Sequence, residues 1–300
     1  MTHMTPKLLF FGSAAAEGVP ALFCNCRVCR EAAARGGPEI RSRTSYNFGG
    51  AVQIDFGPDS LQAWQRYRNV MCEVRHIVVT HAHEDHLQPS DLLYHGLGFA
   101  SVPYRDGPLT IHGTAPTRAR MEREMWLRPG ESLDHRMEES KLVFHEFHPF
   151  EEFELPDCNA VVRTFAADHA PALDPCLVMV TMNGRTVFVG NDSGVFPETT
   201  WNALEPLRGK VEIDVAVLDD TGALLGMPES PSSAPPYERN HMSAPAVIRT
   251  FDRLASAGLL APDCIRAVNH FSHNGGATHR ELRDFWEKRG IVVGHDGLSL

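Results

Sequence analysis

Short apolar runs recur along almost the whole chain, separated by polar segments rich in glycine and proline. Most of these runs carry β-branched or aromatic side chains, and they are too short to form a helix of ordinary length. A pattern of this kind is typical of buried β-strands. The predicted strands cover residues 8–11, 51–54, 77–79, 109–111, 161–165, 176–180, 186–189 and 215–218.

Some of the segments between the runs carry helix signals. The clearest is residues 278–289, where Thr278 is the predicted N-cap, Glu281 stands at the capping-box position and Gly290 ends the helix. Residues 61–67, 115–126 and 244–256 are further candidates. Strands that dominate the first half and recur in the second, with helices between them, predict an α/β (α+β) fold. We expect two mixed β-sheets packed face to face with helices outside, in a single domain over residues 1–300.

Length and composition restrict the function without naming it. A chain of 300 residues with 43% hydrophobic residues can bury a sizeable core. No apolar run approaches the roughly 20 residues that span a membrane. Residues 1–7 lack the pattern of a signal peptide, so we expect a cytoplasmic protein without membrane contact. The net charge of −10, with no basic face, disfavours a nucleic-acid partner.

A cluster of candidate metal ligands follows directly after the strand predicted at 77–79. It consists of His81, His83, Asp85 and His86, all within six positions. Neutral imidazole and carboxylate suit zinc, manganese or iron at a hydrolytic site. One ion cannot use all four at this spacing, but two ions a few ångströms apart can. The alternative is a polar loop that is merely rich in histidine; we interpret the cluster as half of a dinuclear site.

Other potential ligands stand where apolar runs end. His169 follows the run at 161–165, Asp192 follows that at 186–189, His270 follows residues 265–268, and Asp55 follows 52–54. Any one of these alone is more often a structural histidine or a turn aspartate. Their recurrence at strand ends, beside the cluster at 81–86, favours convergence on one edge of the sheets.

Three cysteines crowd together at Cys24, Cys26 and Cys29. In a cytosolic chain this spacing suggests a metal site more than disulfides, and tetrahedral zinc requires a fourth ligand. His270 and His273, three residues apart, offer two imidazoles, one for the predicted dinuclear site and one for the cysteines. The alternative is a turn with three reduced cysteines.

The order His-x-His-x-Asp-His, a later His, Gly-x-Asp-x-Gly and a final His resembles the metallo-β-lactamase superfamily over nearly the whole chain. The resemblance implies an αββα sandwich with a dinuclear site on one edge. In that pattern Asp192 bridges both metals and Asp55 orients the ligand loop from behind. The ligands so implied are His81, His83 and His169 for the first metal, and Asp85, His86 and His270 for the second.

The cysteine segment looks like the PhnP-like phosphodiesterase branch of this superfamily, and in part like the PqqB proteins. By that resemblance Cys24, Cys26, Cys29 and His273 hold a structural zinc in an N-terminal loop at about 18–30. His241, in Asn-His-Met-Ser, matches a residue that contacts the substrate phosphate. A proline-rich insertion at about 226–240 precedes it, and it is either a lid or rim over the site or a mere insertion.

The expected function is metal-dependent hydrolysis of a small phosphodiester, linear or cyclic, through a metal-bridged hydroxide. Two divalent ions, zinc or manganese, and one structural zinc are the expected cofactors. Asp85, Asp192 and His241 are the expected catalytic residues. The rivals are a PqqB-like oxygen-using enzyme, a tRNA 3′-processing endonuclease and a non-catalytic metal-stabilised scaffold. Apolar segments at 92–93 and 97–99, if exposed, would support a homodimer.

Overall fold

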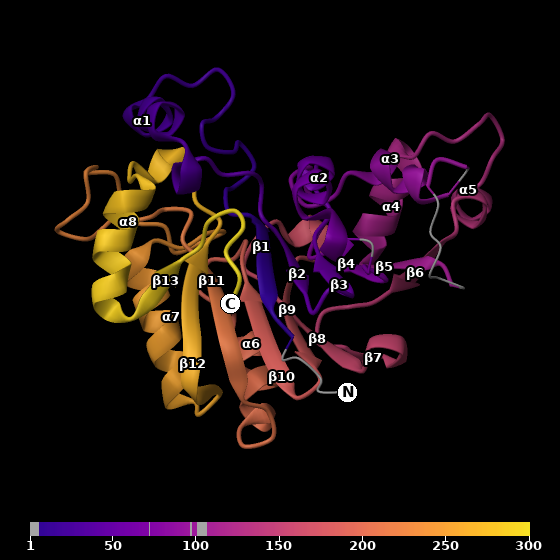
Figure 1. Cartoon of the computed structure of the whole chain (residues 1–300). Helices are drawn as coiled ribbons and strands as arrows, with labels where there is room; N and C mark the ends of the chain where they lie inside the picture. The colour runs from indigo at the N-terminus through magenta and orange to yellow at the C-terminus, as the bar shows by residue number, and fades with distance from the viewer. Residues whose placement is uncertain (1–5, 72, 97, 101–106) are drawn as a thin grey trace.

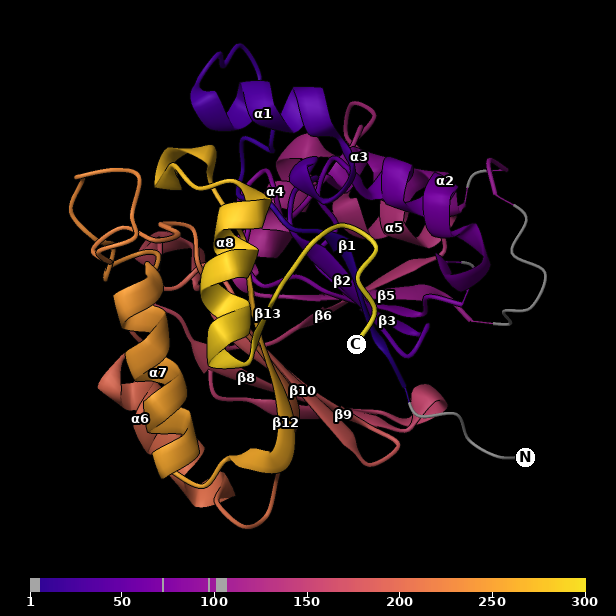
Figure 2. The same cartoon turned by 60° about the vertical axis from the view of Figure 1, so that its left-hand side comes forward.

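The structure, a computed structural model, describes residues 6–71, 73–96, 98–100 and 107–300. Two β-sheets lie face to face at the centre, and helices cover their outer faces (Figures 1 and 2). The expected fold class is therefore confirmed. Among the described residues, no helix is long and apolar enough to cross a membrane.

The first sheet holds six strands in the order β1-β2-β3-β4-β5-β6. Its pairs are antiparallel from β1 to β3 and parallel from β3 to β6. Parallel pairing makes the carboxyl ends of β3, β4 and β5 meet at one edge of the sheet. The strands are β1 (Leu8–Gly12), β2 (Ser45–Phe48), β3 (Val52–Ile54), β4 (His76–Val78), β5 (Leu109–Gly113) and β6 (Leu142–Glu146).

The second sheet holds seven strands in the order β13-β12-β11-β10-β9-β8-β7. Here β7 to β10 pair antiparallel, and β10 to β13 pair parallel. Both sheets are thus mixed. The strands are β7 (Glu152–Leu155), β8 (Ala160–Ala166), β9 (Cys176–Met182), β10 (Arg185–Gly190), β11 (Ile213–Asp219), β12 (Leu260–Asn269) and β13 (Ile291–Val293).

The helices form two outer layers. In Figure 2, α6, α7 and α8 lie along the second sheet, whereas α2 to α5 lie beside the first. α8 begins with the predicted capping box: Thr278 accepts from the Glu281 backbone N–H, and the Glu281 side chain accepts from the Thr278 N–H. The helices are α1 (Arg27–Arg35), α2 (Ser60–Met71), α3 (Pro89–Leu92), α4 (Ala115–Glu124), α5 (Leu133–Glu139), α6 (Glu198–Leu204), α7 (Ala244–Ser256) and α8 (His279–Trp286).

Apolar side chains fill three spaces. Phe10 and Phe48 of the first sheet meet Val178 and Val187 of the second in the inter-sheet core. A second core lies between the second sheet and α6 to α8, and a third lies between the first sheet and α2 to α5. This layering explains why the runs in β4, β9, β10 and β11 are apolar on both faces rather than alternating.

All eight strands predicted from apolar runs are present, with ends shifted by one or two residues. The strands that the patterning missed are β2, β6, β7 and β13, and β12 was expected only in part. β6 and β7 lie at sheet edges and carry exposed charged residues, so β6 has only the short apolar run 142–144 and β7 has none. The expected dimer surface is wrong at Leu92 and Leu93, which are buried in the third core. Phe99 is exposed, and Leu97 lies outside the described residues.

Candidate metal centre

Every predicted ligand of the dinuclear site stands in a loop that follows a strand. His81 to His86 follow β4, His169 follows β8, Asp192 follows β10 and His270 follows β12. The carboxyl ends of these strands meet at one edge of the sandwich, and this edge brings the side chains together. Three of the positions are locally strained: Asp55, Asp192 and His270 have φ angles of 63°, 49° and 64°. Such left-handed backbone in non-glycine residues is typical of functional sites.

A first group of donor atoms consists of His81, His83, His169 and Asp192. The Nδ1 atom of His83 lies 2.9 Å from His81 Nε2 and 3.1 Å from His169 Nε2. The Oδ2 atom of Asp192 lies 3.2 Å from His81 Nε2 and 3.9 Å from His169 Nε2. Four donors therefore surround one point.

A second group consists of Asp85, His86, Asp192 and His270. His86 Nε2 lies 2.7 Å from Asp192 Oδ2 and 3.1 Å from Asp85 Oδ2. His270 Nε2 lies 2.8 Å from Asp192 Oδ1 and 3.8 Å from Asp85 Oδ2. Asp192 thus faces both groups with its two oxygens, which is the position that a bridging carboxylate needs.

The donor set fits a pair of divalent ions. His86 Nε2, His270 Nε2 and Asp192 Oδ1 are buried and make no hydrogen bond with any described residue. Buried polar atoms without partners are costly, and a cation between them satisfies all three. Burial and the neighbouring His86 also hold the pKa of His81 well below its usual value, so its imidazole stays neutral and available for coordination.

The charges of the second donor group also favour cation binding. Burial opposes protonation of His86, but Asp85, Asp55 and Asp192 outweigh it and raise the pKa of His86 well above the usual value. Burial likewise opposes ionisation of Asp192, yet His270 and His86 hold its pKa well below normal. The carboxylates therefore draw positive charge to this point, as protons or as metal ions.

Two polar residues hold His86 from behind. Asp55 Oδ2 lies 2.6 Å from His86 Nδ1, and Asp55 Oδ1 accepts from the Thr80 backbone N–H at 2.8 Å. Thr80 Oγ1 also donates to Asp55. The structure thus places Asp55 where the resemblance implied it, behind the ligand loop with its side chain bonded to His86.

Asp219, at the end of β11, is a candidate site residue that the sequence analysis missed. Its Oδ2 lies 3.1 Å from His241 Nδ1 and 3.4 Å from His270 Nδ1, and Thr221 Oγ1 donates to it at 3.1 Å. The same strand-end position that singled out Asp192 and His270 applies to Asp219, because it follows the predicted strand at 215–218. That signal was sufficient to find it.

His241 lies beside both donor groups. Its ring stacks on His270 with centroids 5.5 Å apart and lies 5.0 Å from the His169 ring. Its side chain is 26% exposed, in contrast to His81, His86 and His270, which are buried. Burial disfavours the cation, but Asp219 and then Asp192 outweigh it and raise the pKa of His241. His241 is therefore a partly accessible imidazole, at the edge of the centre, whose protonated form Asp219 favours.

The three clustered cysteines converge with His273. His273 Nδ1 lies 3.6 Å from Cys24 Sγ and 3.5 Å from Cys26 Sγ, and the four residues form one potential metal-binding group. Cys26 is also the N-cap of α1, where its sulfur accepts from the Cys29 N–H. Burial alone would raise the pKa of Cys26, but hydrogen bonds from Cys29 and Cys24 lower it to about 7. A thiolate forms easily there.

A family model for the beta-lactamase superfamily domain matches residues 51–261, which contain every predicted ligand except His270 and the Cys24–Cys29–His273 group. The chain belongs to the metallo-β-lactamase superfamily. On that assignment it is a metal-dependent hydrolase.

Solved structures share the fold of this superfamily member. A diphosphatase from the PhnP family is similar over 99% of this chain and 97% of its own, with a TM-score of 0.69 and 20% identity. Zn²⁺-bound PqqB from Methylobacterium extorquens is similar over 98% of this chain and 99% of its own, with a TM-score of 0.68 and 17% identity. Human tRNase Z, short form, is similar over 98% of each chain, with a TM-score of 0.56 and 17% identity. No curated protein matches the sequence.

The insertion of this superfamily member, at about 226–240, ends against the ligand loops. The Val195 N–H donates to the Glu238 carbonyl, and the Arg239 Nε donates to Asp168 Oδ2 at 2.7 Å. Asp168 precedes His169, so residues 238–240 border the first donor group. A Cβ on Gly194 would lie 2.5 Å from the Glu238 carbonyl oxygen, so this close approach requires glycine.

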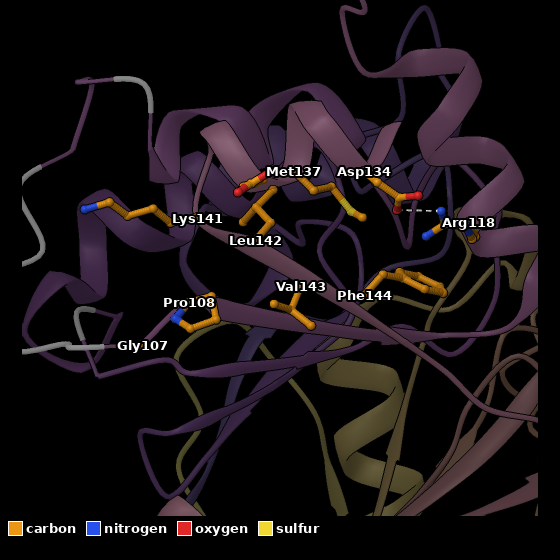
Figure 3. Close-up of a pocket in the computed structure, with 10 residues that line it drawn as sticks. Gly107, Pro108, Arg118, Asp134, Met137, Lys141, Leu142, Val143 and Phe144 are labelled. Atoms are coloured by element: carbon orange, nitrogen blue, oxygen red, sulfur yellow. Dashed lines mark hydrogen bonds and ion pairs between the residues drawn. The ribbon is translucent and has the colours of Figure 1, made fainter. Parts of the chain in front are cut away.

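A separate cavity of about 550 Å³ lies between α5 and β6 (Figure 3). Arg118 and Asp134 form an ion pair of 2.7 Å at one end, and Met137, Leu142 and Phe144 supply apolar walls. None of the predicted ligands of this metallo-hydrolase lines it.

Proposed function

We propose that this metallo-hydrolase is a phosphodiesterase of the PhnP-like branch, acting on a small linear or cyclic phosphodiester. The observation that carries the proposal is the pairing of His241 with the buried carboxylate of Asp219, directly beside the two donor groups. A proton-bearing imidazole at that position suits an anionic phosphoryl group better than a neutral ester.

In this proposal His81, His83 and His169 hold one divalent ion, zinc or manganese, and Asp85, His86 and His270 hold the other, with Asp192 between them. When bound, the ions supply Lewis acidity and lower the pKa of a water molecule to near neutrality. The chain itself orients these ligands through Asp55, Thr80 and Thr221.

His241 then has two tasks, both of which depend on its proton. Its Nδ1 faces Asp219 Oδ2 at 3.1 Å, which fixes the ring and leaves Nε2 free to face the substrate. There the imidazolium binds a phosphoryl oxygen or donates its proton to the departing alkoxide. Asp219 keeps the ring charged and correctly turned, as the carboxylate does in other acid–base pairs.

We further propose that Cys24, Cys26, Cys29 and His273 hold a structural zinc. Three thiolates and one imidazole are a common tetrahedral zinc set. Such an ion would tie the loop at 18–30 to the turn that follows β12. His270 stands in the same turn, three residues before His273, so the zinc would also steady one ligand of the catalytic centre.

Turnover of bis(p-nitrophenyl) phosphate, a chromogenic phosphodiester, tests the proposal. D192A and H81A should abolish turnover, and H241Q should reduce it by about 10²–10⁴-fold, the usual contribution of a general acid. E238Q serves as control, since Glu238 pairs with Arg249 and contacts no ligand side chain. Full activity in D192A would contradict the proposal.

The rival functions give distinct outcomes. An oxygen-using enzyme would consume dioxygen and require iron, so metal analysis of protein made without added metal identifies it. A tRNA-processing enzyme would retard tRNA in a gel-shift assay, although the net charge of −10 opposes binding to a polyanion. We expect neither result, and we expect a small-molecule substrate.

A further inference from the structure

A second histidine cluster lies on β4, β5 and β6 of the first sheet, against β7 of the second. His112 of β5 pairs in register with Val78 of β4 and with His145 of β6. His76 stands two residues before Val78 in β4, so it shares a sheet face with His112 and His145. Phe153 of β7, in the opposite sheet, stacks on His112 at 5.0 Å, which places this face in the inter-sheet space.

These histidines form one hydrogen-bonded chain that ends at a carboxylate. His76 Nδ1 lies 3.0 Å from His112 Nε2, and His112 Nδ1 lies 3.1 Å from His145 Nδ1. At the other end, His76 Nε2 lies 2.7 Å from Asp157 Oδ1. His76 therefore contacts His112 through Nδ1 and faces Asp157 through Nε2.

A sulfur completes the donor set. Asp157 and Cys158 lie in the 3₁₀ turn Pro156–Cys158 that follows β7. A ring nitrogen of His76, an Asp157 oxygen and Cys158 Sγ all lie within 4.8 Å of one another. We propose that His76, Asp157 and Cys158 bind a Zn²⁺ ion, with water as the fourth ligand. Nothing in the proposed phosphodiesterase function uses these residues.

Charge and geometry both favour zinc at this site. One carboxylate and one thiolate balance the two charges of the ion, and imidazole, carboxylate and thiolate are the ligand types that zinc takes. Hydrogen bonding of the second imidazole nitrogen, here to His112, is the usual outer support of a zinc-bound histidine.

Access and proton balance are consistent with binding. The Asp157 side chain is 49% exposed, which leaves a path for the ion from solvent. Arg75 approaches Asp157 Oδ2 at 3.7 Å and does not block Oδ1. Burial raises the pKa of Cys158 to about 11, so zinc binding would release the thiol proton to solvent. The ion would join β4 of the first sheet to the turn after β7 of the second.

Zinc stoichiometry of the full-length protein tests the proposal. Wild-type protein, D157N and C158S are saturated with zinc, freed of loose metal by dialysis and analysed by mass spectrometry. We expect each variant to hold one zinc fewer per chain than wild type. C264S is the matched control, because Cys264 is also a free, half-buried cysteine but lies in β12, outside the proposed site. It should retain the wild-type zinc content.

Two further measurements separate loss of this ion from other effects. In cobalt-substituted protein, C158S should lose part of the thiolate-to-cobalt charge-transfer absorption, while D157N should shift it. Turnover of bis(p-nitrophenyl) phosphate should stay at the wild-type level in both variants, which shows that the strand-end ions remain. Wild-type zinc content and an unchanged cobalt spectrum in C158S and D157N would overturn the proposal, whatever the fate of the phosphodiesterase assignment.

Discussion

Replacement of Asp55 by asparagine tests how the fold supports the metal centre. Asp55 lies at the end of β3 with 2% of its surface exposed. It contacts no proposed metal directly, but its Oδ2 lies 2.6 Å from His86 Nδ1 and its Oδ1 accepts from the Thr80 N–H at 2.8 Å. Asn has the same shape, so D55N changes hydrogen bonding and charge while leaving the packing intact.

The expected magnitude follows from the bonds that asparagine can keep. Its amide oxygen can still accept the hydrogen bond from the Thr80 N–H. Its NH₂ group then faces the Nδ1–H of His86, and because both groups are donors the hydrogen bond to His86 is lost. A hydrogen bond to a charged group contributes about 1.5–3 kcal/mol. Since about 1.4 kcal/mol corresponds to a factor of ten, metal affinity and kcat/KM should each fall about 10–100-fold.

Chelator competition measures the metal affinity, and hydrolysis of bis(p-nitrophenyl) phosphate measures kcat/KM. D59N is the matched control: Asp59 also accepts a backbone N–H, from Arg43 at 2.8 Å, but its carboxylate contacts no predicted ligand. It should behave as wild type. Unchanged affinity and turnover in D55N, or an equal loss in D59N, would refute the reasoning.

Three further outcomes are expected. D219N should move the alkaline limb of the kcat/KM profile to lower pH, because protonated His241 is active only below its pKa and the Asp219 carboxylate raises that pKa. Burial raises the pKa of Asp220 well above normal, although the Trp286 N–H donates to its carboxylate. The folded chain therefore keeps a proton on Asp220 that the unfolded chain releases above a pH of about 4, so this group should make the free energy of unfolding fall as pH rises. D220N should remove the contribution of Asp220 to this slope in urea titrations. T278A should lower the free energy of unfolding by about 0.5–2 kcal/mol through loss of the α8 cap, again measured with urea.

Most of the fold could be predicted because its strands are buried on both faces. β4, β9, β10 and β11 each contain a short continuous apolar run, whose length and β-branched composition indicate a buried strand. β6 and β7 could not be found in this way, since edge strands face solvent and carry polar residues such as Glu146 and Glu154. The order of the strands within each sheet could not be predicted either, because it depends on contacts between segments far apart in the chain.

The candidate site was predictable residue by residue, but its geometry was not. Strand-end positions single out His169, Asp192 and His270, and the structure brings their side chains together. Whether one carboxylate faces both donor groups depends on side-chain directions, which no spacing reveals. Burial was misjudged at Leu92 and Leu93 for a related reason: α3 packs against α4, and this contact is set by tertiary structure.

The turn after β12 connects the two predicted metal groups, because it carries one ligand of each. His270 adopts a left-handed backbone conformation, and the 3₁₀ turn His273–Gly275 follows at once. This reversal sends the His270 imidazole toward Asp192 and the His273 imidazole toward the cysteines, although only two residues separate them. The Ser272 hydroxyl, between them, donates to Glu17, whose carboxylate also lies 3.7 Å from His273 Nε2. Glu17 thus contacts Ser272 in the middle of the turn and His273 at its end, so its carboxylate restricts the movement of the turn. The position of His270 therefore depends on the N-terminal loop as well as on β12.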